Sequence, residues 1–119
     1  MFAMSYHGAN KVAANYNVMG PVKAALEASC RYLAYELGAQ MIRVHPISPG
    51  PIKTRAASGG LKDFDLLLNE AAARAPVGGL VDVMDVGFAC AYLATPYERR
   101  MAHPLETIAS IATSATSRL

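Results

Sequence analysis

The chain has 119 residues, a formal net charge of +2, 53% hydrophobic residues and 17% charged residues. This length and composition indicate one folded domain with its own core and exclude a disordered chain. There is no basic cluster and no apolar run near the roughly 20 residues that span a bilayer, so neither nucleic acid nor a membrane is expected as a partner. The first residues lack a signal-peptide pattern, and we expect a cytoplasmic protein.

The cysteines and histidines, which can bind metals in other proteins, are scattered along the sequence. Cys30 and Cys90 lie within apolar helical patterns and read as buried small hydrophobes of a reducing compartment. His7, His45 and His103 have no partners at metal-ligand spacing, so no metal site is predicted.

The first half of the chain predicts a strand, a loop and a long helix. Residues 1–5 are apolar and suit the end of a strand, and residues 6–10 suit the loop that leaves it. Residues 15–37 predict a helix, capped by Asn15 or Asn17 and ended by Gly38 in the C′ position. Its core stripe has helical spacing and consists of Leu26, Cys30, Leu33 and Leu37.

Tyr16 and Lys23 stand seven residues apart in this predicted helix, almost two turns, and so share a face. A lysine ammonium close to a phenol favours the phenolate and helps the phenol to polarise a carbonyl. The alternative is an ordinary amphipathic face. Pro21 between them predicts a kink unless it falls in the first turn. Glu27 and Arg31 are expected to form an exposed i, i+4 pair.

The next segment predicts a strand that leads into a ligand-binding loop. Residues 41–48, MIRVHPIS, alternate apolar and polar side chains, although Pro46 is unusual for a central strand. A helix followed by a short strand favours a parallel sheet, and ligands bind beyond the carboxyl ends of such strands. Residues 49–54, PGPIKT, would then meet a cofactor, or else form a simple connector.

The remaining residues predict two helices and a tail. Residues 55–62, with Gly59 and Gly60 adjacent, suit a mobile lid or a solvated loop. Residues 64–74 and 85–94 have helical periodicity, and the second helix looks buried on most sides. Residues 101–119 show little pattern and are expected to be poorly ordered.

Taken in order, these residues resemble a known family. Tyr6, the unusually wide Tyr16-x6-Lys23 spacing, RVHPISPGPIKTRAASGG and VDVMDVGFACAYLATPYERR are similar to the carboxyl-terminal half of bacterial NADH-dependent enoyl-acyl-carrier-protein reductases. These enzymes belong to the short-chain dehydrogenase/reductase superfamily, whose typical members space the pair as Tyr-x3-Lys. The resemblance covers residues 1 to about 100.

The resemblance implies a role for each matching residue. Tyr16 would stabilise the enolate formed from a trans-2-enoyl thioester, Lys23 would hold the nicotinamide ribose of NADH, and Tyr6 would line the acyl pocket. The segment that would contact the rest of the cofactor consists of Ile52, Lys53, Thr54, Arg55 and Ala56. Residues 56–64 would form the substrate lid. The implied partners are an enoyl-acyl-carrier protein and further copies of the chain, since the full-length family forms tetramers.

Two departures from the family limit this interpretation. No G-x-G-x-x-G-like phosphate loop occurs, and residues 106–108 keep only a trace of the family's last strand. The expected fold is therefore a partial α/β Rossmann-like doubly wound parallel sheet over residues 1–100, without the N-terminal strands. The function would be enoyl reduction in fatty-acid biosynthesis, with the isolated chain inactive. The alternative is a non-catalytic truncated remnant that serves as an interaction module.

Overall fold

The computed structural model describes residues 1–60, 64–76 and 78–96. Along the chain these form β1 (Phe2–Met4), the 3-10 turn η1 (His7–Ala9), α1 (Met19–Leu37), the 3-10 turn η2 (Gly38–Gln40), β2 (His45–Ile47), α2 (Arg55–Gly60), α3 (Phe64–Arg74) and α4 (Val83–Ala94). The expected tail at residues 101–119 lies outside the described residues.

β1 and β2 pair in parallel, as expected for a strand–helix–strand unit. Phe2 faces His45, Ala3 faces Pro46 and Met4 faces Ile47. The backbone bonds at the ends of the ladder run from His45 N to Met1 O (2.9 Å) and from Ser5 N to Ile47 O (2.7 Å). The backbone N–H and C=O groups of His45 and Ile47 point toward β1. Those of Pro46 between them point toward the opposite edge, so the missing N–H of proline removes no bond to β1.

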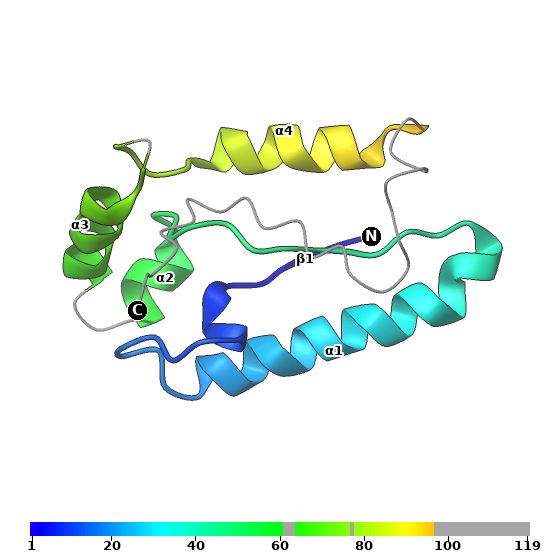
Figure 1. Cartoon of the computed structure of the whole chain (residues 1–119), viewed down its shortest axis with the longest axis horizontal. Coiled ribbons are helices and arrows are strands. Elements are labelled where there is room, and N and C mark those ends of the chain that lie inside the picture. Colours follow the sequence, from blue (N-terminus) through cyan, green and yellow to red (C-terminus); the bar gives the residue numbers. More distant parts are fainter. Residues whose placement is uncertain (61–63, 77, 97–119) are drawn as a thin grey trace.

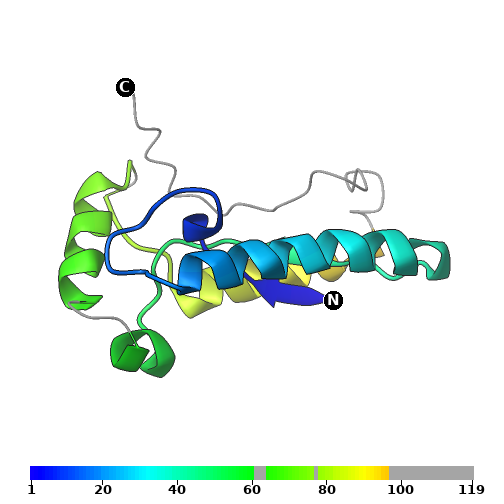
Figure 2. The ribbon, with the colours of Figure 1, turned by 90° about the horizontal axis from the view of Figure 1, so that it is seen from below.

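Helices cover both faces of this small sheet. In Figure 1 α4 lies above the strands and α1 below them, and Figure 2, seen from below, places α1 in front and α4 behind. The buried cluster on the α4 side joins Ile47 of β2 to Val86 and Leu93, with Ile52 and Cys90 packed against it. This helix–sheet–helix layering is an α/β arrangement, which agrees with the expected class.

The start of α1 differs from the prediction. Asn15 and Asn17 have positive φ angles of 60° and 47°, so Tyr16 between them lies in a turn. The helix begins at Met19, and its N-cap residue, Val18, makes no side-chain capping bond. The expected asparagine cap is therefore wrong, because asparagine here supplies the left-handed backbone of the turn rather than a helix cap. Pro21 falls in the first turn, where proline is tolerated.

The connection from α1 to β2 also departs from the expected pattern. Gly38 keeps right-handed helical angles and starts η2, and the left-handed residue that ends the turn is Met41, at φ 61°. Residues 41–44 therefore belong to the turn and its exit, which leaves only His45–Ile47 as strand. Arg43 in this stretch donates from Nη2 to the carbonyls of Ala94 and Thr95, both at 3.2 Å, at the carboxyl end of α4.

The last three helices confirm some expectations and correct others. α3 has the predicted bounds, whereas residues 55–60 form the helix α2 rather than a loop. Their role as a substrate lid stays a prediction. Residues 61–63 lie outside the described part. α4 begins at Val83, earlier than expected, because Asp82 caps it. It is buried on one side only, since Phe88 is 70% exposed and Tyr92 54% exposed.

Candidate functional site

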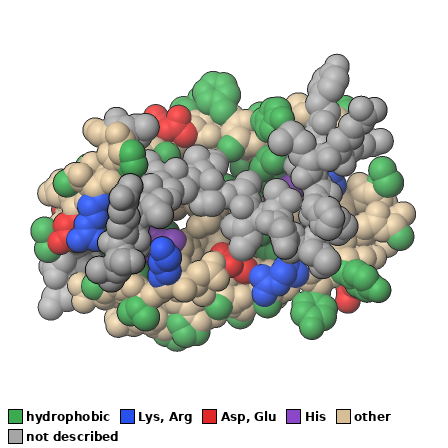
Figure 3. Space-filling model, viewed as in Figure 1, with side chains coloured by type: hydrophobic (Ala, Val, Ile, Leu, Met, Phe, Trp, Pro, Cys, Tyr) green, Lys and Arg blue, Asp and Glu red, His purple; other side chains and the backbone are tan. Residues whose placement is uncertain are grey.

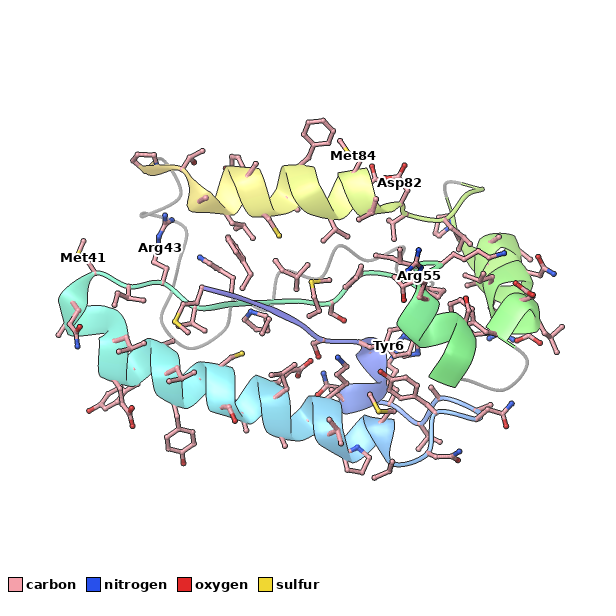
Figure 4. The ribbon with its side chains drawn as sticks, turned by 180° about the vertical axis from the view of Figure 1, so that it is seen from behind. Tyr6, Met41, Arg43, Arg55, Asp82 and Met84 are labelled. Carbon is pink, nitrogen blue, oxygen red and sulfur yellow. The ribbon has the colours of Figure 1, made fainter. Side chains whose placement is uncertain are left out.

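The carboxyl ends of both strands point toward one end of the molecule. η1, the start of α1 and α2 gather there, and in Figure 4 the labelled Tyr6 and Arg55 lie at this same end. In parallel α/β sheets this is the edge where ligands bind. The predicted site residues reach it in two groups, one carried by β1 and α1 and the other by the chain that follows β2.

Tyr6 and Tyr16 are brought together although they belong to different elements. Their ring centroids lie 4.9 Å apart at an interplanar angle of 53°, a tilted aromatic contact. Tyr16 is buried, with 8% of its surface exposed. Gly8 lies directly against the Tyr16 ring, because a Cβ atom at this position would stand 2.6 Å from its Cδ1. The two phenols therefore form one cluster next to η1.

Lys23 does not pair with Tyr16 in the way the helical spacing predicted. Tyr16 precedes the helix, and within the described residues the Lys23 ammonium donates instead to the carbonyl oxygen of Met4, at 2.6 Å. Burial raises the pKa of Tyr16, and burial together with the neighbouring Tyr16 raises the pKa of Tyr6. Both shifts favour the protonated phenols, which can act as hydrogen-bond donors.

A buried carboxylate behind the tyrosines was missed by sequence reasoning. Glu27 is 3% exposed, accepts a hydrogen bond from Ser5 Oγ and accepts a longer one, 3.4 Å, from Asn10 Nδ2. The expected exposed pair with Arg31 is therefore wrong. The available clue was the position of Glu27, four residues after Lys23 and hence on the same face of α1.

The second group follows β2 and is mostly exposed. Ile52 packs against the core beside Ile47, whereas Lys53, Thr54 and Arg55 are exposed. Lys53 lies 3.5 Å from the Asp65 carboxylate, in a pair whose side chains are 72% and 83% exposed. Such an exposed pair contributes little and leaves the ammonium available to a ligand. Ala56 lies in α2, and its side chain is outside the described set.

The donor chemistry of the two groups fits a dinucleotide in kind. Lys53 and Arg55 offer exposed positive charge that suits anionic groups, and the Lys23 ammonium is a hydrogen-bond donor. Neutral phenols offer donors to a carbonyl oxygen. No described helix is both long and apolar enough to cross a membrane, and the described part contains no group of three metal-ligand side chains.

Comparison with known proteins gives a consistent result. The NADH-dependent enoyl-acyl-carrier-protein reductase FabI of Rickettsia prowazekii is 51% identical over 90 residues, which is 76% of this chain and 34% of the relative. The FabI crystal structure from Candidatus Liberibacter asiaticus superposes with a TM-score of 0.84 at 30% identity, covering 97% of this chain and 43% of the other. The reductase of Anaplasma phagocytophilum, solved in complex with NAD, gives 0.76 at 37% identity over 96% of this chain and 39% of the other.

The similarity covers only part of each relative. The chain spans about a third of the length of the curated relatives it matches, and the solved structures extend well beyond it. The sequence profile described as enoyl-(acyl carrier protein) reductase matches residues 1–102, which is most of the chain. This match over most of the chain shows that the chain belongs to the enoyl-acyl-carrier-protein reductase family.

Proposed function

We propose that this chain carries the tyrosine and lysine centre of an NADH-dependent reductase of trans-2-enoyl thioesters on acyl-carrier protein. The observation that carries the proposal is the contact between the Tyr6 and Tyr16 rings at the carboxyl edge of a parallel sheet. NADH, when bound, supplies the hydride. The chain's own residues would then bind and orient the substrate and the cofactor, and would stabilise the charge that develops on the substrate.

Tyr16 is proposed to donate its phenolic hydrogen bond to the thioester carbonyl oxygen. Negative charge develops on that oxygen as the enolate forms, so the bond strengthens toward the transition state. Support comes from the burial of Tyr16, which keeps the phenol protonated and removes competing water. Tyr6 beside it is proposed to line the acyl pocket.

Lys23, Ile52, Lys53, Thr54, Arg55 and Ala56 are proposed to contact the cofactor. In the described state Lys23 holds the Met4 carbonyl, at 2.6 Å. A ribose hydroxyl would therefore share or replace this bond. Lys53 and Arg55 are exposed at the same edge of the sheet and are suited to phosphate charge.

A second candidate, a non-catalytic interaction module, is favoured by a different observation. Large apolar side chains stand exposed on both helical layers, with Tyr35 of α1 at 83% and Phe88 of α4 at 70%. Faces of this kind mark contacts with another polypeptide. Under this alternative the chain would bind no NADH, and its tyrosines would only pack.

An assay of enoyl-thioester turnover separates the two candidate functions. The turnover is measured as the loss of NADH absorbance. We expect Tyr16→Phe to lower kcat roughly 100- to 1,000-fold, as expected for the loss of one donor to a developing oxyanion. The control is Tyr32→Phe, an exposed tyrosine of α1 that should leave the rate unchanged. Measured turnover would correct the expectation that the isolated chain is inactive and would support the reductase. A wild-type chain that neither binds NADH nor turns over the thioester would support the interaction module.

A further inference from the structure

Glu27 is a charged group held almost entirely away from water. An isolated carboxylate in such a position is costly, so its hydrogen bonds must compensate for the lost hydration. It has two donors, the Ser5 hydroxyl and the Asn10 side-chain amide, the latter at 3.4 Å. A carboxylate is an acceptor only and can take both, and the Ser5 bond is the tighter of the two.

These two donors bracket the segment that carries Tyr6. Ser5 precedes Tyr6 directly, η1 follows it, and Asn10 closes that turn with a backbone bond to the His7 carbonyl, at 3.0 Å. Both ends of the segment are therefore tied to one carboxylate on α1. The Ser5 end is also fixed to the sheet through its backbone bond to Ile47.

Lys23, one turn before Glu27 in α1, also ties this segment to the helix. Its ammonium holds the carbonyl of Met4, one residue before Ser5, at 2.6 Å. Lys23 and Glu27 are spaced i, i+4 and therefore lie on one face of the helix. The helix thus holds consecutive residues of the chain through one cation and one anion, immediately before Tyr6.

We propose that Glu27 is a positioning residue: by holding Ser5 and Asn10 it sets η1 in place and so keeps the Tyr6 ring against Tyr16. The consequence for catalysis rests on the proposed function, whereas the consequence for ring geometry does not. Gly8 within η1 already contacts the Tyr16 ring, so a small shift of the turn must move one ring relative to the other.

The ring contact can be measured directly by NMR on the full chain with isotope-labelled tyrosine. The wild type should show nuclear Overhauser effects between the Tyr6 and Tyr16 ring protons, since the centroids are 4.9 Å apart. Glu27→Ala should abolish or greatly weaken them while helical circular dichroism is retained. Glu36→Ala, which removes an exposed carboxylate from the same helix, should leave them unchanged.

Two further variants keep the test decisive if Glu27→Ala does not fold. Glu27→Gln preserves the shape and one acceptor oxygen, so it should retain much of the ring contact. Ser5→Ala removes the tighter donor and should weaken the contact in the same direction as Glu27→Ala. The proposal is overturned if Ser5→Ala, or a folded Glu27→Ala, shows wild-type ring contacts.

Kinetics add a second readout when kcat is calculated per mole of folded protein, with the folded fraction taken from circular dichroism. Where the wild type turns over an enoyl thioester, Glu27→Ala should lower kcat by up to about 100-fold, because displacing Tyr6 misplaces the substrate relative to Tyr16. KM for NADH should be unchanged, and Glu27→Gln should restore much of kcat. A wild type without turnover but with the expected NMR results would refute the proposed function and leave the positioning role standing.

Discussion

At the scale of single residues, Gly8 leaves no room for a side chain. A Cβ atom there would stand 2.6 Å from Cδ1 and 2.8 Å from Cε1 of Tyr16, closer than side chains pack. We therefore expect Gly8→Ala to displace the Tyr16 ring and to lower the free energy of unfolding by about 1–3 kcal/mol, the usual cost of overpacking. Urea denaturation followed by circular dichroism measures this difference.

Gly87 provides the matched control for that substitution. It lies within α4, it is exposed, and a Cβ atom there would have no neighbour within 4 Å. Gly87→Ala should stabilise the protein by roughly 0.5–1 kcal/mol through the better helix propensity of alanine. Equal stability of Gly8→Ala and the wild type would mean that the Tyr16 ring does not occupy the described position.

At the scale of elements, the start of α4 depends on a reciprocal cap. The Asp82 carboxylate accepts from the backbone N–H groups of Met84 (2.7 Å) and Asp85 (3.0 Å), and Asp85 Oδ2 accepts from Asp82 N (2.9 Å). Figure 4 shows Asp82 at the first turn of the helix. Asp82→Ala should cost about 0.5–2 kcal/mol of unfolding free energy and speed amide exchange in that turn. If it costs no more than Glu70→Ala, an exposed acidic residue of α3, the cap has no energetic role.

The same scale separates what the sequence could predict from what it could not. The bounds of α3 and the parallel pairing of the strands follow from local periodicity and element order, and both were expected. The position of Tyr16 in a turn was not expected. Asn15 and Asn17 adopt left-handed backbone angles there, and the helix begins only at Met19. Short polar side chains make such turns without leaving any gap in hydrophobic periodicity.

The contacts that define the site were the hardest to foresee. Ser5 and Glu27 are 22 residues apart, and Lys23 reaches a backbone carbonyl 19 residues away. Such contacts depend on how β1 and α1 pack, which no local pattern encodes. The residue types at the site could be named from the sequence, but their partners could not. The expected exposed Glu27–Arg31 pair was wrong for this reason, and Tyr16 and Lys23 do not share a helical face because Tyr16 precedes α1.

At the scale of the whole molecule, the described chain has a thin core and broad apolar surfaces. Figure 3 shows hydrophobic side chains standing out along α4 at the top and along α1 at the lower right. The exposed large hydrophobic residues of these two helices include Val22, Tyr32, Tyr35, Val83, Met84, Phe88 and Tyr92. The side chain buried below 2% is Ile47, at the centre of the β2–α4 contact. The stability of the described part should therefore depend strongly on Ile47.

That dependence leads to a graded prediction at Ile47. Ile47→Val should cost about 0.5–1.5 kcal/mol and Ile47→Ala about 2–5 kcal/mol, because the second leaves a larger cavity between β2 and α4. A domain of ordinary stability has only about 5–15 kcal/mol in total, so Ile47→Ala should remove a large share of it. Thermal denaturation of both variants beside Cys90→Ala, a partly buried neighbour in the same cluster, measures the series. If the three variants melt together, the layers are held mainly elsewhere. Arg43 then becomes the next contact to test, since it joins the turn before β2 to the backbone carbonyls of Ala94 and Thr95 at the end of α4.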